Sequence, residues 1–85
     1  MTQPLTMYTT PWCGYCRRLK SQLARENIEV TEVDIEREPV AAEYVMTVNG
    51  GNQTVPTVLF ADGSTLTNPS VRAIKQRMEE LAVTR

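Results

Sequence analysis

The spacing of apolar and polar residues predicts four short strands and three helices in this chain. Short runs of β-branched, aromatic and other apolar residues favour strands at Leu5–Thr9, Ile28–Ile35, Thr57–Ala61 and Ser64–Thr67. Helical spacing favours helices over Gly14–Glu26, from Pro39 to a stop at Asn49-Gly50-Gly51, and from Pro69 onward. The alternation in the second strand slips between Val30 and Val33, so the register of that strand stays open.

Each predicted helix has one apolar stripe that would face the core. In the first helix the stripe is Cys16, Leu19 and Leu23. In the second helix it is Val40, Tyr44, Val45 and Val48. In the third it is Val71, Ile74, Met78 and Leu81. Helices of this kind are typical of a compact α/β domain, in which they pack on a sheet.

Turn and cap residues mark the boundaries of these elements. Pro39 suits the first turn of the second helix, because its fixed φ angle is already helical. Asp62-Gly63 predicts a two-residue hairpin turn between the last two strands. Asn68 is expected to cap the third helix, with Pro69 as its first residue.

The predicted order of elements is β-α-β-α-β-β-α, over a single domain at residues 1–85. A strand–helix–strand start requires a parallel crossover, and the later hairpin adds an antiparallel pair. The expected architecture is therefore a four-stranded mixed sheet flanked by three helices. With 85 residues, the chain can bury one small core but no large enclosed cavity.

Composition and charge exclude several classes of function. The chain has no histidine, which rules out Cys–His and Ser–His nucleophile pairs and any histidine-ligated metal site. A net charge of -1 gives no reason to expect nucleic acid or an acidic membrane as partner. There is no secretory signal pattern and no apolar run long enough to span a membrane, so a cytoplasmic location is expected.

Cys13 and Cys16 form a Cys-x-x-Cys pair where the first strand gives way to the first helix. In a reducing cytosol this spacing indicates redox or metal chemistry more than a structural staple. At the helix N-cap, the Cys13 sulfur would face unpaired backbone N–H groups and the positive end of the helix dipole, which favour thiolate. Cys16 lies on the same helical face, and Gly14 lets a substrate approach closely.

A more acidic thiol helps mainly when it is the leaving group. A fall in pKa from about 8.5 to about 6.5 raises the thiolate fraction at pH 7.4 about 12-fold, but it lowers nucleophilicity roughly 10-fold. The same fall speeds expulsion of the thiol. Cys13 therefore suits a shuttle that accepts a thiol adduct and then surrenders it. Three basic residues on the first helix either add to this effect or only form a solvated face: Arg17, Arg18 and Lys20.

Two other interpretations of the cysteine pair have less support. A static disulfide or inert core pair needs no function, but the position between strand and helix favours chemistry. A zinc knuckle needs four ligands, and the chain offers two thiols and no imidazole. The Val55-Pro56 segment before the third strand also has two possible interpretations. It is either a proline at a strand start with no further role, or a cis peptide bond that presents the Val55 backbone to a substrate.

The whole pattern resembles the glutaredoxin family, which has a thioredoxin-like fold. The resemblance rests on the early Cys-Gly-Tyr-Cys, on Thr54-Val55-Pro56, and on a hairpin followed by a last helix. It implies that Cys13 is the nucleophile, Cys16 the second thiol of a redox-active disulfide, and Pro56 a cis-proline beside the sulfurs. Tyr15 would flank the substrate sulfur or pack on the helix start, and Trp12 would be a docking platform or a cover for that helix.

More narrowly, the chain is similar to the mycoredoxins, the actinobacterial members of the family that use mycothiol. The similarity includes the segments Tyr8-Thr9-Thr10, Val48-Asn49-Gly50-Gly51-Asn52 and Ala61–Ser70. Ordinary glutaredoxins hold the charged ends of glutathione with a basic residue before Thr-Val-Pro and acidic residues after the hairpin. Here those places hold Gln53 and Thr67-Asn68-Pro69-Ser70, which suit mycothiol, because that thiol has no free ammonium or carboxylate.

The resemblance implies a monomeric thiol-disulfide oxidoreductase that reduces protein–mycothiol mixed disulfides through a Cys13–mycothiol intermediate. Mycothiol would be a co-substrate, with no tightly bound cofactor or metal, and an NADPH-dependent mycothiol disulfide reductase would regenerate it. The neutral residues Thr67 and Asn68 would contact mycothiol. Two alternatives stay open: a ribonucleotide-reductase-type redoxin reduced by thioredoxin reductase, and a non-catalytic iron–sulfur carrier.

Overall fold

The computed structural model describes residues 4–83 and has the element order that the sequence predicts. Its strands are β1 (Thr6–Thr9), β2 (Thr31–Asp34), β3 (Thr57–Leu59) and β4 (Thr65–Thr67). Its helices are α1 (Gly14–Arg25), α2 (Pro39–Val48) and α3 (Val71–Val83). No helix within this range is long and apolar enough to cross a membrane.

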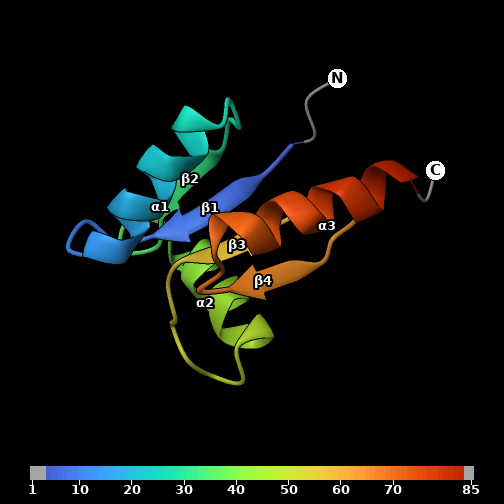
Figure 1. The fold of residues 1–85 in the computed structure, drawn as a ribbon. Coiled ribbons are helices and arrows are strands. Elements are labelled where there is room, and N and C mark those ends of the chain that lie inside the picture. Colours follow the sequence, from blue (N-terminus) through green and yellow to red (C-terminus); the bar gives the residue numbers. More distant parts are fainter. Residues whose placement is uncertain (1–3, 84–85) are drawn as a thin grey trace.

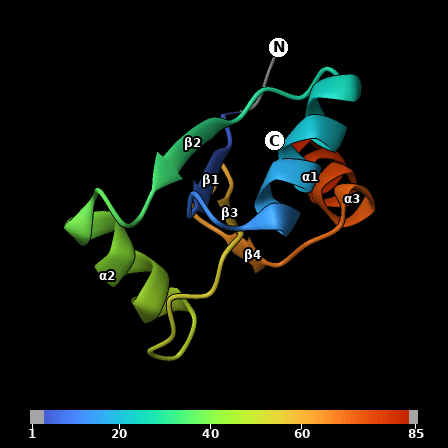
Figure 2. The same ribbon diagram turned by 90° about the vertical axis from the view of Figure 1, so that its left-hand side faces the viewer.

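The four strands form one mixed sheet in the order β2-β1-β3-β4. β1 runs parallel to β2 and antiparallel to β3, and β4 pairs antiparallel with β3. Helices α1 and α3 cover one face of the sheet and α2 covers the other (Figures 1 and 2). This arrangement is the thioredoxin-like fold that the sequence predicts. The carboxyl end of β1 leads directly into the start of α1, where the two cysteines lie.

A hydrophobic cluster fills each face of the sheet. Under α1 and α3 the buried members are Leu5, Met7, Leu19, Leu23, Val58, Phe60 and Ile74. Three residues of the predicted α3 stripe pack against this cluster while partly buried, namely Val71, Met78 and Leu81. Under α2 the buried members are Tyr8, Ile35 and Val45, and the rings of Tyr8 and Tyr44 lie 5.5 Å apart. The stripes predicted for α1 and α3 are thus confirmed.

The stripe predicted for α2 is wrong at its first residue. Val40 is 80% exposed, so it does not face the sheet. Ala41 and Ala42 pack against the buried cluster in its place. The apolar pattern gives most weight to large side chains, whereas the start of α2 rests on the sheet through small ones.

Three predicted boundaries are also corrected. β2 starts at Thr31 and not at Ile28, because the Ile28 N–H donates to the Leu23 carbonyl and still belongs to the turn that ends α1. The hairpin loop has three residues: Phe60 N–H donates to the Ser64 carbonyl, and Gly63, at φ +91°, donates to the Phe60 carbonyl. A three-residue hairpin loop of this kind is a type I turn followed by a β-bulge, in which glycine takes the left-handed position.

The third correction concerns the start of α3. Asn68 has a φ of +53° and is not the N-cap, which needs extended backbone. The helix begins at Val71, and the Ser70 hydroxyl accepts the N–H of Ala73 at 3.1 Å. Ser70 is therefore the capping residue, and Asn68 and Pro69 belong to the segment that leads from β4 to α3.

Glu32 on β2 joins three elements. One of its carboxylate oxygens accepts a hydrogen bond from the Lys20 ammonium of α1 at 2.7 Å. The other accepts one from the Thr9 hydroxyl of β1 at 3.0 Å. The Lys20 hydrogen bond, helped by that of Thr9, holds the pKa of Glu32 below its ordinary value of 4.5. Because an unfolded chain would take up the proton first, the contribution of Glu32 to stability is present above pH 4.5 and is lost as the pH falls below it.

We therefore expect Glu32→Gln to make the free energy of unfolding less dependent on pH in the acid range. At pH 7 the substitution should cost no more than about 1 kcal/mol, because the ion pair is partly exposed. Below pH 4.5 the difference from the wild type should shrink toward zero. Urea unfolding at a series of pH values measures this, with the exposed Glu29→Gln as the matched control. Equal pH slopes for the wild type and Glu32→Gln would show that the contact does not matter.

Candidate active site at the start of α1

Cys13 is the N-cap residue of α1, as the sequence predicts. Its backbone is extended, and its sulfur accepts the Cys16 N–H at 3.1 Å. The Cys13 N–H donates to the Thr10 carbonyl at 3.2 Å, which closes the turn between β1 and α1. A sulfur held in this way meets the backbone donors and the positive dipole end of the helix, both of which stabilise negative charge on it.

Cys13 and Cys16 are joined by a disulfide, with their Cα atoms 5.3 Å apart. The two residues differ in accessibility, at 8% exposed for Cys13 and 1% for Cys16. Cys16 lies on the inner face of α1, one turn before Leu19, whereas Cys13 stands at the helix end. Of the two sulfurs, that of Cys13 is therefore the one an external thiol or disulfide can reach.

The basic residues of α1 do not all gather at its start. Lys20 forms its ion pair with Glu32, so it belongs to the link between α1 and β2. The Arg17 guanidinium turns back and donates to the Pro11 carbonyl at 2.9 Å, in the turn before Cys13. Arg17 thus stays beside the helix start, whereas Lys20 is the cation of a surface ion pair with Glu32.

Trp12, Gly14 and Tyr15 form the rim around Cys13. Trp12 is 70% exposed, and its indole N–H donates to Glu36 at 2.6 Å. A Cβ added to Gly14 would meet no atom within 4 Å, which leaves open space above the helix start. The Tyr15 hydroxyl donates to the Pro69 carbonyl at 3.1 Å and ties α1 to the segment before α3.

The segments around Pro56 and Asn68 lie side by side. The Val55–Pro56 peptide bond is cis, and Pro56 is buried at the start of β3. The Asn68 N–H donates to the Pro56 carbonyl at 2.7 Å, which continues the β3–β4 pairing beyond Thr67. Thr67 and Asn68 are exposed, and Val55 is half-buried. The structure thus brings the predicted binding residues of both segments to one edge.

Two residues that contact predicted site residues are given no site role by the sequence pattern. Glu36, in the loop after β2, holds the indole of Trp12. Asn49, which the sequence marks as the end of α2 and as part of a segment similar to the mycoredoxins, is hydrogen-bonded to Thr57 of β3 and Thr67 of β4. Both act through partners far away in the sequence, and no local motif indicates them.

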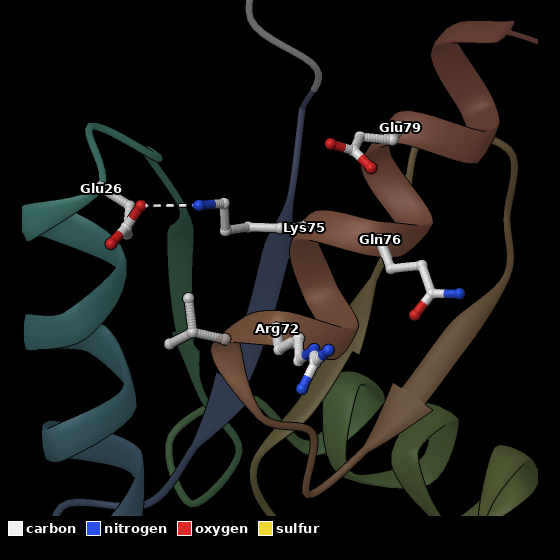
Figure 3. A pocket seen from close by; sticks show the side chains of 6 residues that line it. Glu26, Arg72, Lys75, Gln76 and Glu79 are labelled. Carbon is white, nitrogen blue, oxygen red and sulfur yellow. Dashed lines mark hydrogen bonds and ion pairs between the residues drawn. The ribbon is translucent and has the colours of Figure 1, made fainter.

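An open groove along α3, beside the last turn of α1, has no comparable chemistry. Its volume is about 560 Å³, and an ion pair of 2.9 Å between Lys75 and Glu26 crosses it (Figure 3). Glu26 lies at the end of α1, opposite the end where Cys13 lies. Within residues 4–83, no three carboxylate or cysteine side chains gather as a metal ion would require. The cysteine pair is thus the candidate site.

Comparisons with known proteins agree with this site. The family model described as "Glutaredoxin" matches residues 5–65. A protein of Mycobacterium tuberculosis classed by its name with the glutaredoxins is 58% identical over 82 residues, which is 96% of this chain and 98% of that one. "Mycoredoxin 1" of Corynebacterium glutamicum is 41% identical over 78 residues, 92% and 96% of the two chains. The solution structure of a glutaredoxin from Brucella melitensis aligns with a TM-score of 0.69 at 23% identity, covering 96% and 88%.

Proposed function

Because this chain belongs to the glutaredoxin family of thiol-disulfide oxidoreductases, we propose that it reduces protein–mycothiol mixed disulfides, with mycothiol as its electron donor. The observation that carries the proposal is the placement of Cys13. Its sulfur caps α1 and is the more exposed of the pair, while Cys16 is 1% exposed beneath it.

In the proposed first step, the Cys13 thiolate attacks the mycothiol sulfur of the mixed disulfide. The old S–S bond breaks, and the client protein leaves as a thiolate that takes up a proton. A second mycothiol thiolate then attacks the bound mycothiol, which forms mycothiol disulfide and expels the Cys13 thiolate. The backbone donors of α1 stabilise that leaving group, here the N–H of Cys16. An NADPH-dependent mycothiol disulfide reductase returns the small thiol to its reduced form.

Cys16 provides a second route. Its thiolate can attack the Cys13 adduct, release the small thiol and form the Cys13–Cys16 disulfide, which is the state of the pair in this structure. Its low exposure suits a thiol that reacts with Cys13 and not with external substrates. This route serves clients that are reduced by two thiols.

The preference for mycothiol is supported by the neutral residues of the binding edge. Mycothiol is an acetylated cysteine on a glucosamine–inositol disaccharide, and it presents hydroxyl and amide groups without free ionic ones. Gln53, Thr67 and Asn68 are exposed and offer uncharged hydrogen-bonding groups. Identity of 41% to a protein named "Mycoredoxin 1" points the same way. Trp12 is proposed as a docking surface for the client, since 70% of it is exposed at the rim.

The test compares one model protein with the same cysteine bearing either mycothiol or glutathione. Each substrate is supplied with its own small thiol and recycling reductase, and NADPH consumption is followed. We expect kcat/KM to be at least about tenfold higher for the mycothiol adduct, which corresponds to one or two neutral hydrogen bonds. Equal values would leave a glutaredoxin without mycothiol specificity. Turnover with thioredoxin reductase alone would favour the ribonucleotide-reductase-type redoxin instead.

A further inference from the structure

The Asn49 side chain is hydrogen-bonded to three elements beside the proposed binding edge. Its Nδ2 donates to the Val45 carbonyl of α2 at 2.9 Å and contacts the Thr57 hydroxyl of β3 at 3.1 Å. Its Oδ1 lies 2.5 Å from the Thr67 hydroxyl of β4. The Thr57 hydroxyl also lies 2.8 Å from the Thr54 carbonyl, just before the cis-proline segment. Thr57 and Thr67 are directly opposite each other in the sheet.

Two carbonyl groups fix the direction of every proton in this network. A carbonyl oxygen only accepts, so Asn49 must turn its NH₂ group toward Val45, and Thr57 must donate to Thr54. Because the Thr57 hydroxyl proton is used in that bond, the Thr57 oxygen can only accept a hydrogen bond from the Asn49 NH₂ group. Both amide hydrogens of Asn49 are then occupied, and its oxygen faces Thr67. Thr67 must give its one hydroxyl proton to that oxygen.

We infer that Asn49 makes the Thr67 hydroxyl an acceptor toward bound ligands, and so selects thiols that bring hydroxyl or amide donors over thiols that bring carboxylates. The inference rests on the proposed function, because it takes Thr67 as part of the mycothiol-binding edge. Thr67 is an exposed residue, and its hydroxyl oxygen has only lone pairs left to offer. A sugar hydroxyl can donate to them, whereas a carboxylate placed there loses water without gaining a donor. Asn49 is a positioning residue, since it acts through Thr67.

The experiment uses one peptide whose single cysteine carries mycothiol, glutathione or a methylthio group. The methylthio adduct has the same reacting disulfide and no sugar. Wild type is compared with Asn49→Ala, Thr67→Val and Thr67→Ser. Asn52→Ala is the control: the Asn52 Nδ2 donates to the Asn49 backbone carbonyl at 3.3 Å, so the variant removes a neighbouring amide and leaves the Asn49 side chain in place. For Asn49→Ala and Thr67→Val, kcat/KM with the mycothiol adduct should fall about five- to tenfold, mainly through KM.

The remaining readouts separate recognition from general damage. Asn52→Ala should reduce all three adducts as the wild type does, and Thr67→Ser should keep the mycothiol preference. For Asn49→Ala and Thr67→Val, the fall in kcat/KM should be larger with the mycothiol adduct than with the methylthio adduct. Thermal midpoints identify any unfolding, and Thr67→Val provides a test that leaves the end of α2 intact. A wild-type preference for mycothiol that survives both Asn49→Ala and Thr67→Val overturns this inference alone. A wild type without that preference overturns the proposed mycothiol specificity together with it.

Discussion

Replacement of Cys13 by serine is expected to abolish reduction of a protein–mycothiol mixed disulfide, lowering kcat/KM at least about a thousandfold. The proposed chemistry has no other accessible nucleophile, because Cys16 is 1% exposed on the inner face of α1. Serine is itself a favourable N-cap residue, so the start of α1 should stay intact. The loss then reports on the sulfur and not on the helix. NADPH-coupled turnover with a defined mixed disulfide measures it, and circular dichroism checks the fold.

Cys16→Ser is the matched variant, and it should behave differently. In the one-thiol scheme a second mycothiol resolves the Cys13 adduct, so turnover on the mixed disulfide should stay within about threefold of the wild type. Reduction of a client that needs both thiols should be lost, because the Cys13–Cys16 disulfide can no longer form. If Cys16→Ser is as inactive as Cys13→Ser on the mixed disulfide, the one-thiol scheme is wrong and the buried thiol is the resolving group.

The order of the elements and the place of the cysteines could be predicted because both depend on local pattern. Apolar stripes at helical spacing give the buried faces of α1 and α3, and Ile74 and Leu19 are fully buried as expected. Cys13 precedes a helix in the sequence, which is enough to place it at the N-cap. The cis bond before Pro56 was suggested by the family resemblance, since no local rule distinguishes it from a trans bond.

The sequence pattern misleads where a tertiary contact overrides a local signal. Asn68-Pro69 has the composition of a helix start, but the Asn68 N–H is needed by the Pro56 carbonyl. That bond holds Asn68 at φ +53°, a conformation that asparagine tolerates better than most residues. The capping role moves to Ser70. What the sequence presents as a helix cap is, in the structure, the continuation of the β3–β4 edge.

The contacts of Trp12 with Glu36 and of Asn49 with Thr67 could not be predicted from the sequence. Trp12 and Glu36 are 24 positions apart, and Asn49 and Thr67 are 18 apart. Each pair meets only because a strand returns to the same end of the sheet. Asn49 also ends α2, and that local role is sufficient to explain an asparagine there. A residue with a sufficient local explanation gives no sign of a second role until the fold is known.

Ile74→Ala is expected to lower the free energy of unfolding by about 2–5 kcal/mol, the usual cost of removing a large aliphatic side chain from a packed core. Ile74 is fully buried in the cluster between α3 and the sheet, with Leu19 and Leu23 of α1. The truncation leaves a cavity that these neighbours can fill only in part. Urea unfolding followed by circular dichroism gives the change, provided that the slope with denaturant stays constant.

Val40→Ala is the matched control, because it truncates an aliphatic residue at the start of α2. Val40 is 80% exposed, so the substitution should change stability by no more than about 0.5 kcal/mol, and the higher helix propensity of alanine favours a small gain. A loss of several kcal/mol at Val40 would mean that α2 packs through the stripe predicted from the sequence.

Because Tyr15 of α1 is bonded to Pro69 just before α3, the Ile74 variant also tests whether the site needs a rigid core. If kcat holds for Ile74→Ala well below its unfolding temperature, the cysteine turn keeps its geometry independently of how tightly α3 is packed.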